Sequence, residues 1–273
     1  MGSIPISQVT LMSHPLDGAQ AKVERSHDQL QTLVADLDAF RQGEPHKVIS
    51  ENDSDAREWT IRFQVLKPFE RVVAVQIGEI VHNLHSALDH LVWQLAILEA
   101  ETPSKSTKLQ FPVFLTESGY RERGNEKLPG VSVAAKALIE SLQPFATGED
   151  RDSPLWHLYS LSVWDKHKDV PLAGMLSQRF VFGPVRMKDV EHIILAGPQL
   201  LKHDAVIGVI RMKPGASYTP PNGVKMKTQV IVVEAFEQPE AVAGREVTTT
   251  LGKCGERVNE ILEQFRTQIF VER

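Results

Sequence analysis

Residues 77–94 read Ile77-Gly78-Glu79-Ile80-Val81-His82-Asn83-Leu84-His85-Ser86-Ala87-Leu88-Asp89-His90-Leu91-Val92-Trp93-Gln94. At about 100° per residue, one broad face of this stretch is apolar, which predicts a helix. That face consists of Ile77, Ile80, Val81, Leu84, Ala87, Leu88, Leu91 and Leu95. The opposite face carries Glu79, His82, Asn83, His85, Ser86, Asp89 and His90, and no Lys or Arg occurs between Arg71 and Lys105. This polar face is typical of a buried polar network or a site rather than of a solvated surface.

The pattern around this stretch predicts an α+β protein with a core of three to four long antiparallel helices. We expect these helices at about 15–41, 69–100, 154–165 and 246–268. Trp59, Ile61, Phe63 and Val65 alternate with polar residues, which predicts a strand within a hairpin at 46–66. Apolar, β-branched runs between glycines and prolines predict an antiparallel sheet formed mainly by residues 170–236. We expect one domain over 1–273, with a helical part (about 15–165 and 246–268) and a sheet part (about 170–236).

Composition narrows the class of protein. The 273 residues carry a formal net charge of −5, which argues against a protein that coats polyanions through clustered Lys and Arg. Cys254 is the single cysteine, which excludes an internal disulfide. We expect it to lie on a helix with its thiol in the protein core. The first twelve residues lack the pattern of a secretory signal, and no run approaches the ~20 apolar residues that span a bilayer. We therefore expect a cytoplasmic protein with no membrane partner.

The polar face favours acid–base chemistry. Residues three and four apart are neighbours on a helix, so His85 lies beside Asp89, and a carboxylate beside an imidazole fixes its tautomer. A second polar group, Asp165-Lys166-His167-Lys168, ends the predicted helix at 154–165. We expect the polar face to meet Asp165 and His167.

Two motifs carry a family resemblance. Asn83-Leu84-His85-Ser86-Ala87-Leu88-Asp89-His90-Leu91 with Asp165-Lys166-His167-Lys168 resembles a group of uncharacterised bacterial proteins. Their helix reads His-Asn-Leu-Arg-Ser-Ala-Leu-Asp-His and is followed by Asp-Lys-His-Arg. An Arg, four residues and a His is also similar to the signature of the HEPN superfamily, helical domains many of which are metal-independent ribonucleases that act as dimers.

The resemblance implies roles for single residues. His90 matches the superfamily histidine and would be the base, while His85 stands where the superfamily has arginine and would be the phosphate-side donor. Asp89 and Asn83 would orient them. It also implies an RNA or nucleotide partner, a homodimer and no cofactor. A histidine lacks the permanent forked charge of arginine, so a relative that has lost catalysis is an alternative.

Two further interpretations stay open. Glu79, His82, His85 and Asp89 have the spacing of a helical His and carboxylate site for a transition metal ion, which would make a metal-dependent enzyme. The polar face is also compatible with a satisfied network in a module that binds a small ligand or a protein without catalysis. In either case His157, on a strongly apolar helix, is expected to be a hydrogen-bonded core histidine. Gly78 indicates a close approach of another backbone or a tolerated defect in the helix.

Overall fold

The computed structural model describes residues 14–99, 108–168, 173–182, 187–216 and 228–271. Contacts divide the chain into two compact units. We call them the helical unit (1–30, 78–169 and 251–273) and the sheet unit (31–77 and 170–250). The fold is α+β, as the sequence predicts. That both units form one domain stays a prediction.

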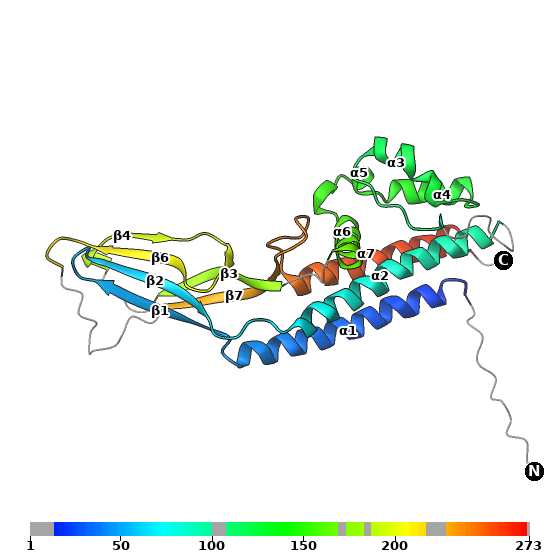
Figure 1. The fold of residues 1–273 in the computed structure, drawn as a ribbon. Helices are drawn as coiled ribbons and strands as arrows, with labels where there is room; N and C mark the ends of the chain where they lie inside the picture. The colour runs from blue at the N-terminus through cyan, green and yellow to red at the C-terminus, as the bar shows by residue number, and fades with distance from the viewer. Residues whose placement is uncertain (1–13, 100–107, 169–172, 183–186, 217–227, 272–273) are drawn as a thin grey trace, which may run out of the picture. The chain divides into compact units, whose positions relative to one another are not determined.

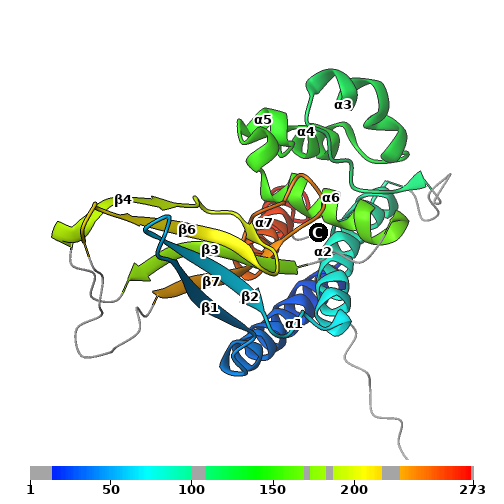
Figure 2. The same cartoon turned by 60° about the vertical axis from the view of Figure 1, so that its left-hand side comes forward.

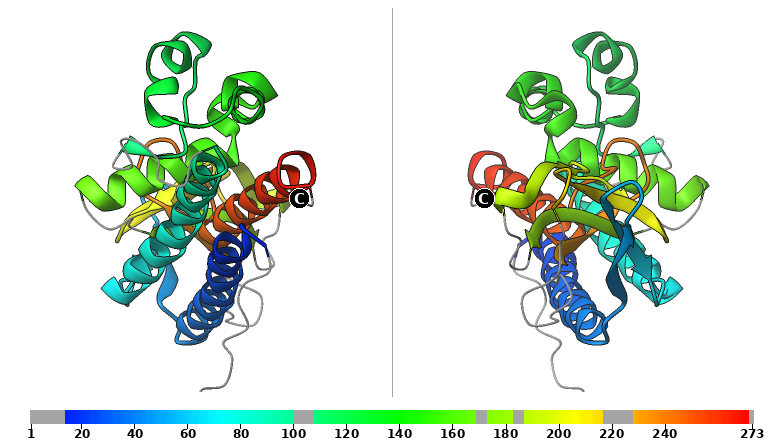
Figure 3. Two further views of the ribbon diagram at one scale, coloured as in Figure 1. Left: turned by 90° about the vertical axis from the view of Figure 1, so that its right-hand side faces the viewer. Right: turned by 90° about the vertical axis from the view of Figure 1, so that its left-hand side faces the viewer.

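The predicted long helices are confirmed. They are α1 (Asp17–Gln42), α2 (Arg71–Ile97), α6 (Pro154–His167) and α7 (Val247–Gln268). Helix α2 begins two residues later than predicted, after Pro68, and residue 100 lies outside the described residues. Within the helical unit, α1, α2 and α7 lie side by side (Figure 1; Figure 3, left).

The apolar face of α2 is buried as its spacing predicts. Each of the eight apolar residues named above is at most 2% exposed, from Ile77 to Leu95. Burying such side chains stabilises a fold by roughly 1.5–3 kcal/mol each. This burial sets the rotation of the helix, and therefore the direction in which its polar face points.

The segment between α2 and α6 holds more helix than the sequence analysis predicts. The Pro, Ser, Lys and Gly residues of 101–130 predict a loop, yet α3 (Glu117–Arg123) forms there because Thr116 accepts a hydrogen bond from the Gly119 backbone N–H at its start. A capping serine, Ser132, before the apolar positions Val133, Leu138, Ile139 and Leu142 predicts a short helix. It is confirmed as α4 (Val133–Ser141), and α5 (Pro144–Thr147) follows. Residues 111–114, which we call the clip, fold back onto the core, with Phe111 and Val113 buried.

In its described residues, the sheet unit contains seven strands. The predicted hairpin is confirmed as β1 (His46–Asp53) paired with β2 (Glu58–Val65). The later strands are β3 (Ala173–Phe182), β4 (Val190–Leu195), β5 (Leu200–Leu201), β6 (Ala205–Met212) and β7 (Thr228–Phe236). They form two antiparallel sheets, ordered β1-β2-β6-β4 and β5-β3-β7, instead of the single sheet predicted.

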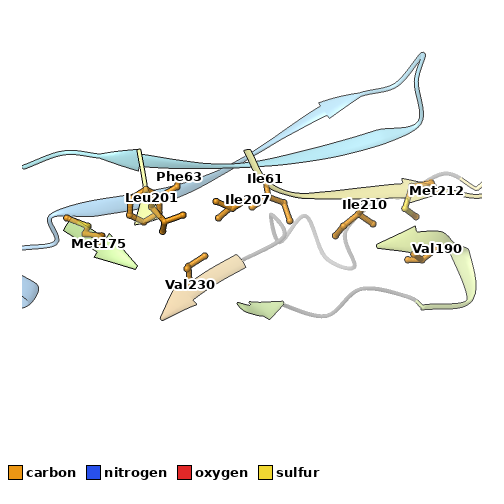
Figure 4. Packing of buried hydrophobic residues seen from close by; sticks show 9 residues of the cluster. All are labelled: Ile61, Phe63, Met175, Val190, Leu201, Ile207, Ile210, Met212 and Val230. Carbon is orange, nitrogen blue, oxygen red and sulfur yellow. The ribbon is translucent and has the colours of Figure 1, made fainter. Parts of the chain in front are cut away.

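The two sheets exist because the strands bury one face each. Figure 2 shows β1, β2, β6 and β4 in one layer and β3 and β7 in the other. Side chains from both layers form one apolar cluster between them, in which Ile61, Phe63 and Ile207 are fully buried (Figure 4). An alternating strand needs a second apolar surface against its inner face, and here the other sheet supplies it.

Candidate functional site

The polar face of α2 divides into two rims. At about 100° per residue, Asn83 and His85 lie about 160° apart around the helix, so one partner cannot serve both. We call Glu79, Asn83 and His90 the α1 rim, and His85 and Asp89 the clip rim. His82 and Ser86 lie between the rims, and His82 is exposed.

On the α1 rim, one side chain of α1 bridges two residues of α2. Asn83 Nδ2 donates to Gln29 Oε1 at 2.8 Å, and Gln29 Nε2 donates to Glu79 Oε2 at 3.1 Å. Glu79 is exposed and Asn83 is half-buried. The bonds therefore form an open network at the seam between the two helices.

His90 lies against the first turns of α1. Its Nδ1 atom is 4.0 Å from the position that a Cβ atom on Gly18 would take. Lys22 follows Gly18 by one helical turn and therefore lies on the same face of α1. Partial burial lowers the pKa of His90 from its ordinary value, the charge of Lys22 lowers it further, and Asp89 opposes the change.

Lys22 is the residue that sequence reasoning missed. The periodicity of α1 assigns it to a solvated polar face, and no local motif marks it. Only the antiparallel pairing of α1 with α2, which aligns Gly18 with His90 and Gln29 with Glu79, brings its charge to an imidazole.

On the clip rim, Asp89 holds a backbone segment. Its Oδ1 atom accepts a hydrogen bond from the Phe111 backbone N–H at 2.9 Å. Its Oδ2 atom lies 3.4 Å from His85 Nδ1, a buried atom that has no hydrogen-bond partner. The His85 side chain is only 12% exposed. Asp89 thus fastens the clip to α2 and lies beside His85.

A cation also approaches the clip rim. Lys127 lies near Asp89, and its Nζ atom is 5.7 Å from the ring centre of Phe114 and 5.9 Å from that of Tyr159. Partial burial lowers the pKa of Lys127, and Asp89 counteracts that effect. The polar face has no Lys or Arg of its own, but the fold brings one lysine to each rim.

Asp165 reaches α2 at Gly78. A Cβ atom on Gly78 would lie 2.7 Å from Asp165 Oδ1, a distance that real Cβ atoms do not show. The segment that approaches Gly78 is thus the carboxylate of a side chain and not a backbone as predicted. Among the described residues, no hydrogen bond joins Asp165 or His167 to the polar side chains of α2, and His167 is exposed at the end of α6.

The residues of the metal alternative do not converge. Glu79 turns toward Gln29 on α1, whereas Asp89 turns toward the clip. Within the described ranges, no three or more His, Cys, Asp or Glu side chains are grouped so that they could hold a metal ion. The donor set therefore does not fit a transition metal ion, and we derive no chemistry through one.

Two expectations about single residues are confirmed. His157 is 5% exposed, and its Nε2 atom forms a hydrogen bond with the Arg151 carbonyl oxygen at 2.9 Å. Cys254 is fully buried on α7, where burial raises the pKa of its thiol to about 12. Both residues belong to the core of the helical unit and take no part in a surface site.

Comparisons of the chain with protein-family models, with curated proteins and with solved structures find no match. Only the residues and their contacts therefore indicate a function. None of the helices that the structure describes combines the length and the apolar character needed to cross a membrane.

Proposed function

We propose that the helical unit is a HEPN-like, metal-independent phosphodiesterase that acts on RNA. The observation that carries the proposal is the position of His90, whose imidazole lies against α1 with the charge of Lys22 beside it. A neutral imidazole and a permanent cation are the two groups that this reaction requires.

The chemistry follows from these two groups. Because its pKa is lowered, His90 is neutral near pH 7 and can take the proton of a ribose 2′-hydroxyl. The 2′-oxygen then attacks the adjacent phosphorus, the bond from phosphorus to the 5′-oxygen breaks, and the leaving 5′-oxygen takes up a proton. Lys22 stabilises the negative charge that develops on the phosphoryl oxygens. The products are a 2′,3′-cyclic phosphate and a 5′-hydroxyl end.

In this proposal, Lys22 supplies the positive charge that the superfamily arginine would provide and that this chain lacks at His85. The resemblance assigns phosphate binding to the position of His85, which lacks the charge of an arginine. Lysine is a point charge without the forked geometry of arginine, but it remains protonated at neutral pH. In this proposal the cation therefore comes from α1.

His85 keeps a role only if two copies of the chain share a site. At about 100° per residue, His85 and His90 point about 140° apart, so they do not face one phosphate within one chain. We propose a homodimer in which the His85 of one copy, oriented by Asp89, protonates the leaving oxygen at the His90 of the other. A relative that binds RNA without cleaving it is the alternative.

The test is cleavage of an end-labelled single-stranded RNA by the full chain in the presence of EDTA. We expect the wild-type chain to release fragments with a cyclic phosphate end, and His90→Ala to lose at least about 100-fold in rate. We expect Lys22→Met to lose about 10- to 100-fold, because it removes one group that stabilises the transition state.

Matched controls separate these effects from general damage. His192→Ala removes an exposed histidine of β4, and Lys253→Met removes an exposed lysine of α7, so both should cleave as the wild type does. If the wild-type chain does not cleave RNA, or if His90→Ala cleaves equally well, the phosphodiesterase proposal is wrong. Retained RNA binding in the absence of any cleavage would instead support the non-catalytic relative.

A further inference from the structure

A groove runs along the helical unit on the side of α1 that faces away from His90. It lies among α1, α2 and α7 and has a volume of about 510 Å³. Apolar side chains from all three helices line it, among them Val23, Ile80, Leu84 and Leu251. Figure 3 (left) shows the three helices that form its walls. This volume falls within the range of about 300–1,000 Å³ that is typical of small-molecule sites.

Two glycines of α7 leave the groove open. Gly252 and Gly255 both line it, although glycine in the middle of a helix destabilises the folded state relative to alanine. A Cβ atom at these positions would meet only Leu30 Cδ2 at 3.9 Å and Leu84 Cδ2 at 4.0 Å, which are ordinary contacts. Since packing within the chain does not require glycine there, the missing methyl groups serve to enlarge the groove.

The polar groups of the groove favour a hydrogen-bond donor. Gln20 Nε2 donates to Asn259 Oδ1 at 3.1 Å, which leaves Gln20 Oε1 buried without a hydrogen-bond partner. A buried acceptor of this kind destabilises the fold until a donor reaches it. A ligand with an N–H group would supply that donor.

The charges of the groove also favour a ligand with a cationic hydrogen-bond donor. Three carboxylates line it, those of Glu24, Asp28 and Glu256, and its described lining residues include His27 but no Lys or Arg. The carboxylates that line the groove would repel an anion and attract a cation. Acceptors and negative charges therefore surround an apolar floor.

We propose that this groove binds an apolar organic cation of small-molecule size. Its apolar body would rest on Ile80 and Leu84, and its protonated amine would donate to Gln20 Oε1 and lie near Glu24 and Glu256. This site is separate from the RNA site proposed above, because Gln20 and Glu24 lie on the opposite side of α1 from Gly18 and Lys22.

The test uses three probes with one ring system and different charges: 2-naphthylmethylamine, 2-naphthylmethanol and 2-naphthoate. Binding to the full chain is measured by titration calorimetry and by the shift in the melting temperature. We expect the amine to bind one per chain, the alcohol to bind at least about tenfold more weakly, and the anion not to bind.

Variants test whether the amine binds in the groove. Gly255→Leu fills it and should abolish binding of the amine, while Gly255→Ala is a milder change that the contacts accommodate and should weaken it. Glu24→Gln should weaken the amine by about tenfold and leave the alcohol unchanged. Lys253→Ala, on α7 but outside the lining, is the control and should bind the amine as the wild type does.

Several outcomes would overturn the proposal. The proposal is wrong if the amine and the alcohol bind equally tightly. It is also wrong if Gly255→Leu and Glu24→Gln, both folded by circular dichroism, bind the amine as tightly as the wild type. A Gly255→Leu chain that changes its sedimentation instead would identify the groove as a contact between copies. None of these measurements involves RNA, so their failure leaves the phosphodiesterase proposal intact.

Discussion

The α1 rim and the clip rim of helix α2 each hold a carboxylate and an imidazole, but their partners differ. On the clip rim, Asp89 accepts a backbone hydrogen bond from Phe111, and His85 is nearly buried beside it. On the α1 rim, Glu79 and Asn83 share one flexible glutamine, and His90 is exposed beside a lysine charge. Similar residues on one helix, with the histidines five positions apart and the carboxylates ten, thus have different surroundings. The first pair fastens the clip to α2, and the second is exposed.

The prediction with the largest expected effect concerns the homodimer. It tests whether His85 of one copy and His90 of the other form one site. His85→Ala and His90→Ala should each be nearly inactive toward RNA, with losses of about 100-fold or more. An equal mixture should regain about a quarter of the wild-type rate, because half of the dimers are mixed and each has one intact site. The measurement is the initial rate of cleavage after the two chains are exchanged by dilution and reconcentration. A mixture that is no faster than its parents would confine the site to one chain and remove His85 from it.

The next effect concerns stability and compares the two rims directly. Asp89→Ala should lower the free energy of unfolding by about 1–3 kcal/mol, because it leaves the buried Phe111 N–H without its acceptor. Asp89→Asn should cost less, since its side-chain oxygen can still accept that bond. Asn83→Ala removes a bond at an open seam and should cost less than about 1 kcal/mol. Urea unfolding measures all three, and an equal loss for Asp89→Ala and Asn83→Ala would contradict the structural role of the clip rim.

A third prediction tests the contact between α6 and Gly78. Gly78→Ala gains about 1 kcal/mol of helix propensity, but the Asp165 carboxylate must turn aside to admit the Cβ atom, so the net gain should be well below about 1 kcal/mol. In an Asp165→Ala background the same change should stabilise the chain by up to about 1 kcal/mol. The two unfolding differences form a double-mutant cycle. Should Gly78→Ala stabilise both backgrounds alike, Asp165 would not be the reason for glycine.

The smallest effect concerns the pKa of His90. Nuclear magnetic resonance should find that His90 titrates below the ordinary histidine value of 6.5, and Lys22→Met should raise its pKa because a neighbouring positive charge is removed. Folded His90 binds a proton less readily than the unfolded residue, so this group lowers stability as the pH falls below about 6.5 and ceases to do so as the pH rises above it. A titration unchanged by Lys22→Met would mean that the lysine does not act on His90.

Much of the fold can be predicted from the sequence, because buried apolar residues recur with the period of a helix or of a strand. The eight apolar residues of α2 and the alternation from Trp59 to Val65 predict a helix and a strand, and both are present with their apolar faces in the core. Periodicity does not predict short elements. Helix α3 has seven residues and depends on a single cap at Thr116, which is too little pattern to distinguish from a loop. It does not predict the division of the strands into two sheets either, because periodicity does not say which strand pairs with which.

The candidate site divides in the same way. The sequence by itself determined that one helix carries an apolar face and an opposite face of imidazoles, carboxylates and an amide, since a helix places residues at known angles. Only the tertiary structure decided the partners: Lys22 beside His90, the clip on Asp89, and Asp165 against Gly78. These residues come from segments far apart in the chain, and no local spacing encodes such contacts. They follow from how the buried faces of separate elements pack, which depends on the whole folded chain.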